Sequence, residues 1–73
     1  MITIYGRPGC SYCTQAIKVC EASDIPYEYI NMADDAATIA ELTAKIGPIR
    51  TVPQIFEGDT HLGGYTELLA HLR

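Results

Sequence analysis

The stretch of sequence that decides the fold is Gly6–Cys13, which reads GRPGCSYC. It follows the apolar, β-branched run Ile2–Tyr5, and its glycines and proline predict a tight loop after a buried strand. Behind it, apolar residues recur at helical spacing and predict a helix from about Ser11 to Ala22. Cys10 and Cys13 therefore lie where a strand gives way to a helix.

The composition is that of a small globular chain. Its 73 residues are 48% apolar and 19% charged, which favours a packed core over disorder. The net charge of -4 and the absence of a basic run disfavour nucleic acid or an anionic membrane as a partner. The sequence has no apolar run of about 20 residues and no recognisable signal peptide. We therefore expect a single domain over residues 1–73 that is monomeric and cytoplasmic.

The chain has three cysteines, an odd number at uneven spacing, unlike the frameworks that staple small secreted domains. In a reducing compartment such cysteines are more often redox-active, metal-binding or buried. Cys20 falls at helical spacing from Cys13 and Ile17, on the apolar stripe of the first helix. We expect it to be a small buried residue.

The middle of the chain predicts a strand and then a helix. Alternating residues in Tyr27–Asn31 are typical of a strand. The segment Asp34–Lys45 has acidic residues at its front and predicts a helix. Its apolar face is expected to contain Ile39, Leu42 and Ile46.

The last third predicts a hairpin and a final helix. Thr51–Phe56 leads into a third strand, and Gly58 marks a turn into a short fourth strand near Thr60–Leu62. A final helix is expected at Thr66–Leu72. The predicted fold class is thus α/β, with the order β-α-β-α-β-β-α and a small mixed sheet covered by helices.

The two cysteines at the start of the first helix favour redox chemistry. The N–H groups and dipole at a helix N-terminus stabilise a thiolate, and Arg7 adds a nearby cation. We therefore predict a pKa for Cys10 well below the value of about 8.5 for a free thiol. Cys13, one turn further on, should be less exposed and less ionised. Cys10 is then the nucleophile that attacks a disulfide, and Cys13 resolves the mixed disulfide.

Three alternatives are weaker. A zinc site needs four ligands, and beyond the pair the chain offers only Cys20, His61 and His71, so no metal is expected. A structural disulfide that closes so small a loop would stabilise little in a reducing compartment. Accidental spacing is disfavoured by the strand, loop and helix around the pair.

Three motifs, GCSYC, TVPQIF and HLGGYTEL, occur in this order, and together they resemble the glutaredoxins over nearly the whole chain. C-x-x-C alone is common, but C-S-Y-C followed by T-V-P and G-G-Y-T is specific. The resemblance implies a minimal thioredoxin fold, with a four-stranded mixed sheet in the order 2-1-3-4 and three helices.

The resemblance also implies an enzyme, a glutathione-dependent thiol-disulfide oxidoreductase. It would reduce protein disulfides and glutathione mixed disulfides, with glutathione as the electron donor and co-substrate. Such a protein serves electron transport and cell redox homeostasis. The partners implied are disulfide-containing or glutathionylated proteins, with ribonucleotide reductase as one candidate.

The resemblance predicts where glutathione binds. Pro53 should follow a cis peptide bond and stand opposite Cys10, and the backbone of Val52 would pair with the cysteinyl part of glutathione. Arg7 and Arg50 would face its glycyl carboxylate.

The other end of glutathione is expected at the last helix. Gly63 and Gly64 would let the backbone approach the ligand closely, and the N–H groups of Thr66 and Glu67 would bind the γ-glutamyl carboxylate. The side chain of Glu67 resembles the acidic residue that meets the α-amino group, and Tyr12 and Tyr65 would form walls. The predicted glutathione-binding residues are Arg7, Tyr12, Thr51, Val52, Pro53, Gly64, Tyr65, Thr66 and Glu67.

Ser11 departs from the family pattern, since the usual active site is C-P-Y-C. Some relatives with C-S-Y-C hold a [2Fe–2S] cluster between two subunits, so a cluster-binding glutaredoxin is one alternative. Another is a related redoxin that takes electrons from thioredoxin reductase and passes them to ribonucleotide reductase. Those redoxins lack the G-G-Y-T motif that this chain has.

Overall fold

The element order is the one that the sequence predicts. A computed structural model describes residues 1–73. The helix predicted at Ser11–Ala22 and the strand predicted at Tyr27–Asn31 have the expected bounds, and the other elements shift by one to three residues at their ends. The elements are β1 (Ile2–Gly6), α1 (Ser11–Ala22), β2 (Tyr27–Asn31), α2 (Ala36–Ile46), β3 (Gln54–Glu57), β4 (Thr60–Gly63) and α3 (Tyr65–His71).

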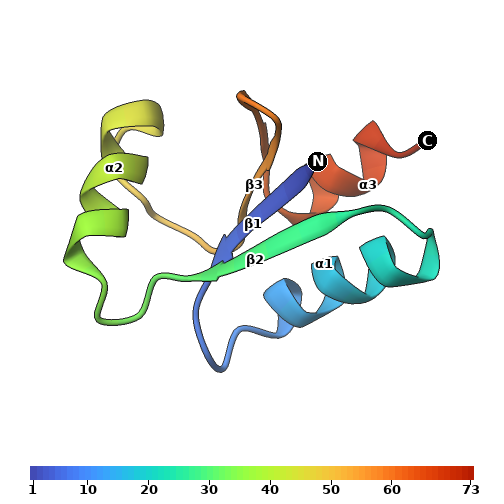
Figure 1. The fold of residues 1–73 in the computed structure, drawn as a ribbon, viewed down its shortest axis with the longest axis horizontal. Coiled ribbons are helices and arrows are strands. Elements are labelled where there is room, and N and C mark those ends of the chain that lie inside the picture. Colours follow the sequence, from blue (N-terminus) through green and yellow to red (C-terminus); the bar gives the residue numbers. More distant parts are fainter.

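The four strands form one mixed sheet in the order β2-β1-β3-β4, as the resemblance implies. At its centre, Ile4 of β1 lies opposite Tyr29 in the parallel pair with β2 and opposite Ile55 in the antiparallel pair with β3. Helices α1 and α3 lie together on one side of the sheet, and α2 lies on the other (Figure 1). None of the helices is both long enough and apolar enough to cross a membrane.

The main core lies between the sheet and the pair α1 and α3. Because successive side chains of a strand point to opposite faces, Ile2 and Ile4 of β1 both face this side. Cys20 is fully buried here, which confirms its predicted packing role, and burial raises the pKa of its thiol, with the Glu21 carboxylate as a smaller cause. The six buried residues of this core are Ile2, Ile4, Ala16, Cys20, Ile55 and Leu68.

The other face of the sheet has a smaller core under α2, made by Met32, Leu42 and Phe56. Asp35 begins this helix, because its Oδ1 accepts a hydrogen bond from the N–H of Thr38 at 3.1 Å. Leu42 is the only fully buried residue of α2, whereas Ile39, which the sequence places on the same apolar face, is not buried. Ile39 is 41% exposed, because the small core of three residues does not extend to the first turns of the helix.

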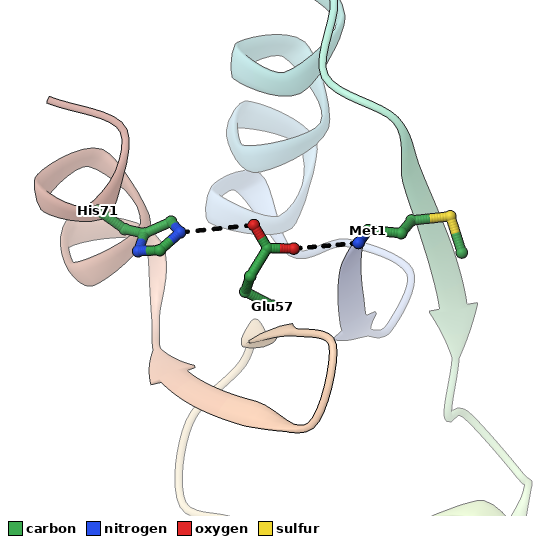
Figure 2. Close-up of polar contacts among 3 residues, drawn as sticks. All are labelled: Met1, Glu57 and His71. Atoms are coloured by element: carbon green, nitrogen blue, oxygen red, sulfur yellow. Dashed lines mark ion pairs between the residues drawn. The ribbon is translucent and has the colours of Figure 1, made fainter.

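Glu57, at the end of β3, joins three parts of the chain (Figure 2). Its Oε2 lies 3.1 Å from the terminal amine of Met1, and its Oε1 lies 3.5 Å from Nε2 of His71 in the last turn of α3. The hydrogen bond from the amine is the main cause of a lowered pKa for Glu57, and His71 adds to it. All these groups are partly exposed, so the contribution to stability is small.

Candidate active site

Cys10 is the N-cap of α1. Its backbone is extended, with φ -95° and ψ 106°, and its Sγ accepts a hydrogen bond from the N–H of Cys13 at 3.2 Å. Cys10 and Cys13 are joined by a disulfide, so the structure shows the oxidised state of the pair. Cys10 is half-buried and Cys13 is only 2% exposed, which confirms the predicted asymmetry of access.

This geometry gives the two sulfurs different chemistry. In the reduced protein, a thiolate at Cys10 would lie at the positive end of the α1 dipole. It would also accept a hydrogen bond from the N–H of Cys13, and both interactions favour the anion. Cys13 is enclosed by protein, so an incoming disulfide meets Cys10 first. The third cysteine, Cys20, lies in the main core. No three His, Cys, Asp or Glu side chains gather where they could hold a metal ion.

Gly6 contributes to this site in a way that sequence reasoning missed. It is the buried last residue of β1, and its carbonyl oxygen accepts the N–H of Met32 at 2.8 Å. A Cβ added at Gly6 would lie 2.6 Å from Sγ of Cys13 and 3.0 Å from Cε1 of Tyr29. The sulfur of Cys13 therefore packs directly against the backbone of β1, where only glycine fits without a shift.

The loop before β3 faces the disulfide. The peptide bond between Val52 and Pro53 is cis, as the resemblance predicts, and the carbonyl oxygen of Val52 lies 3.7 Å from Sγ of Cys10. Gln54, which the sequence did not single out, braces this loop. Its Nε2 donates to the carbonyl oxygen of Thr51 at 2.9 Å, and its Oε1 lies 2.8 Å from Nε2 of His61. Since that oxygen can only accept, the imidazole Nε2 is the donor.

A recess of about 200 Å³, which we call the polar hollow, opens beside this loop. The aromatic rings of Tyr12 and Tyr65 approach each other at its edge, with centroids 5.7 Å apart and planes tilted by 34°. Eight of the nine residues predicted to bind glutathione line it, and Arg7 does not. The lining residues are Tyr12, Thr51, Val52, Pro53, Gly64, Tyr65, Thr66 and Glu67.

The start of α3 forms one end of the polar hollow. Gly64 is the N-cap, and Oε1 of Glu67 accepts its N–H at 2.7 Å, which fixes this carboxylate over the first turn. Gly63 has φ 124°, and a Cβ there would lie 2.7 Å from Cγ of Glu67. The close approach that needs a glycine at position 63 is thus to the Glu67 side chain. The first N–H groups of α3, including that of Thr66, have no partner within the helix.

Arg7 and Arg50 lie next to the polar hollow, in a second recess of about 380 Å³ that contains Cys10 and no acidic residue. Both arginines are exposed, and neither forms an ion pair within the chain. Two of the five lysine and arginine residues of a chain with net charge -4 therefore lie at its disulfide. Their positive potential favours an anionic ligand there, and also the thiolate form of Cys10.

Comparisons with known proteins agree with this geometry. The glutaredoxin family model matches residues 2–62. The chain belongs to the glutaredoxin family. A glutaredoxin of Vibrio cholerae is 38% identical over 78 residues, a match that covers 99% of this chain and 90% of that protein. Its family and its Cys10–Cys13 pair are those of a thiol-disulfide oxidoreductase.

Solved structures give the same result. The fold matches that of reduced Escherichia coli glutaredoxin with a TM-score of 0.80 at 36% identity, covering 97% of this chain and 91% of that one. It also matches a buckwheat glutaredoxin in complex with glutathione, with a TM-score of 0.81 at 27% identity, covering 99% of this chain and 67% of that one. The thioredoxin-type fold predicted from the resemblance is confirmed.

Proposed function

We propose that this glutaredoxin uses glutathione to reduce disulfides, with the tripeptide bound in the polar hollow. The observation that carries the proposal is the position of this hollow, which lies between the loop at Val52 and the start of α3, beside Cys10. The existence of a buckwheat relative in complex with glutathione supports the choice of ligand.

Each part of glutathione has a complementary group. The backbone N–H and C=O of Val52 would pair with its cysteinyl part, in the manner of an added β-strand. The unpaired N–H groups at Thr66 and Glu67 suit the γ-glutamyl carboxylate. Oε1 of Glu67 already accepts a hydrogen bond from the N–H of Gly64, so Oε2 of Glu67 is the oxygen available to the α-amino group of glutathione. The glycyl carboxylate would then extend toward Arg7, outside the hollow.

The reaction proceeds by two exchanges. The Cys10 thiolate attacks one sulfur of a substrate disulfide, so a Cys10–substrate disulfide forms and the other substrate sulfur leaves as a thiolate. Cys13 then attacks Cys10, which releases the second substrate thiol and leaves the Cys10–Cys13 disulfide. One glutathione opens this disulfide by bonding to Cys10, and a second removes the first as glutathione disulfide. With a glutathionylated substrate, Cys10 takes the glutathione directly and Cys13 is not needed.

The substrates we propose are disulfide-containing and glutathionylated proteins, and ribonucleotide reductase remains a candidate. We propose further that residues 1–73 act as one cytoplasmic, monomeric domain in cell redox homeostasis. Cys10 lies in a recess that opens at the surface and is not an enclosed cavity, so a large substrate can reach it.

A coupled assay tests the electron donor. Reduced glutathione with glutathione reductase should support turnover of a small mixed disulfide, and thioredoxin reductase should not. Cys10→Ser should abolish turnover with every substrate, whereas Cys13→Ser should lose reduction of protein disulfides and keep deglutathionylation. Cys20→Ala, a cysteine change away from the site, is the matched control and should keep both. Turnover with thioredoxin reductase alone would contradict the proposal and favour the redoxin alternative.

A further inference from the structure

A third recess, which we call the apolar groove, lies on the other side of Val52 from the polar hollow. It measures about 250 Å³, and Met32, Ile39, Ile49 and Val52 give it a largely apolar lining. Arg7 and Asp34 are its charged members. Neither the exchange reaction nor the proposed glutathione site uses this groove, apart from the shared Val52 and Arg7.

The groove shares Arg7 and Val52 with the recess that contains Cys10. A small recess of about 70 Å³, lined by Arg7, Ile49, Arg50, Thr51 and Val52, shares residues with both. Val52 borders every one of these recesses, and its carbonyl oxygen lies 3.7 Å from Sγ of Cys10. A chain that is disulfide-bonded to Cys10 can therefore extend in two directions, toward the polar hollow or toward the apolar groove.

The lining indicates what kind of side chain would fit. Ile39 is one of the few large apolar residues that the fold leaves well exposed, and Ile49 beside it is half-buried. Covering these surfaces with another aliphatic side chain removes apolar area from water on both partners, which is favourable. The volume suits one leucine-sized side chain better than a whole folded surface.

The charges near the groove select the rest of the partner. Arg7 and Arg50 lie between the groove and Cys10 and have no ion pair in this chain. Asp34 is the only acidic member of the groove. A segment with acidic residues near its cysteine would be attracted here, and a basic one would not.

We propose that the apolar groove receives a large aliphatic side chain from an extended, acidic segment of a protein substrate while the cysteine of that segment is disulfide-bonded to Cys10. This docking site rests on the proposed exchange reaction at Cys10, but not on the binding of glutathione. The polar hollow and the apolar groove then separate the two partners of the enzyme, the tripeptide on one side and the protein on the other.

The test measures one exchange at equilibrium. The full chain with Cys13→Ser, glutathionylated at Cys10, is mixed with an eight-residue peptide that has one cysteine and acidic flanks. The peptide thiolate attacks Cys10, a Cys10–peptide disulfide forms, and glutathione leaves as the thiol. Acid quenching and mass spectrometry give the exchange constant. Four peptides have leucine at position -2, -1, +1 or +2 from the cysteine, and a fifth has alanine at all four.

At least one leucine peptide should exceed the alanine peptide by about fivefold, as expected for partial burial of its side chain. Adding Ile39→Gln should reduce that preference to below about twofold. Ala40→Gln is the matched control, because it places the same side chain at an exposed neighbouring position of α2 that does not line the groove. It should keep the preference. Replacing the acidic flanks by lysines should lower exchange several-fold at low salt and much less at 0.5 M salt.

Equal exchange of all five peptides would overturn the proposal, and so would equal effects of Ile39→Gln and Ala40→Gln or a preference for lysine flanks. The peptide series uses an unaltered groove, so it remains decisive even if Ile39→Gln misfolds. Glutathione competes equally with every peptide, so the ratios do not depend on how it binds. Failure of the proposed function would instead appear as no turnover in the glutathione-coupled assay.

Discussion

Replacing Gly6 by alanine should destabilise the protein by acting on the resolving cysteine. The new Cβ would lie 2.6 Å from Sγ and 3.2 Å from Cβ of Cys13, and 3.0 Å from Cε1 of Tyr29. Carbon and sulfur atoms in contact normally stay well beyond 3 Å, so at least one of these neighbours must move. Cys13 is buried in the first turn of α1, so its side chain has little room to shift, whereas the ring of Tyr29 in β2 is only partly buried.

The magnitude follows from two opposing effects. Overpacking of a buried site lowers the free energy of unfolding by about 1–3 kcal/mol. Alanine also restricts the unfolded chain more than glycine does, which raises it by about 0.4–1 kcal/mol. The net loss should be about 1–2 kcal/mol, which lowers the Tm of a domain of this size by about 5–15 °C. The backbone of Gly6 lies in a regular strand and does not have a positive φ, so the loss is steric and not conformational.

A double-mutant cycle measures this contact directly. Urea unfolding of the reduced protein gives the free energies of unfolding of the wild type, Gly6→Ala, Cys13→Ala and the double variant. Because Cys13→Ala removes Sγ but keeps Cβ, the cost of Gly6→Ala should fall by about 1 kcal/mol in that background, and the contacts with Tyr29 and with the Cβ at position 13 should account for the remainder. An equal cost in both backgrounds, or no cost at all, would refute the role assigned to Gly6.

Two further changes test the helix starts. Asp35→Ala removes the carboxylate that caps α2 and should lower the Tm at pH 7 by about 5 °C. Hydrogen bonds from Thr38 are the main cause of a lowered pKa for Asp35 in the folded protein, so its stabilisation is complete above the ordinary pKa of about 4 and is lost as the pH falls through the lowered value. The Tm difference between wild type and variant should therefore shrink in acid, and a constant difference would contradict this. Gly63→Ala combines a positive φ with a Cβ 2.7 Å from Cγ of Glu67, and should destabilise by about 1–3 kcal/mol in urea unfolding. Wild-type stability would show that α3 can begin without this glycine.

Much of the fold follows from local patterns. The loop at Gly6–Cys13 separates a β-branched run from a helical stripe, and this fixes β1, α1 and the place of the two cysteines between them. The strand order and the cis bond before Pro53 came from the resemblance to glutaredoxins, because neither leaves a trace in periodicity or composition. The eight residues that line the polar hollow were predicted in the same way.

What the sequence did not predict depends on contacts between elements. Periodicity places Ile39 on the same face as Leu42, but it does not say how much of that face the sheet covers. Gly6 was read as a loop residue, since its close contact with Cys13 exists only once β1 and α1 are packed together. The hydrogen bonds from the side chain of Gln54 to Thr51 were likewise not predicted, because they depend on the direction in which that side chain points.

The measurement closest to the central claim is the rate of alkylation of the reduced protein as a function of pH, with the labelled cysteine identified by mass spectrometry. The account predicts that Cys10 reacts first and that its rate follows a pKa well below the value of about 8.5 for a free thiol. It also predicts that Cys20 stays unlabelled in the folded protein. A midpoint at or above that value, or equal labelling of Cys10 and Cys13, would contradict the account.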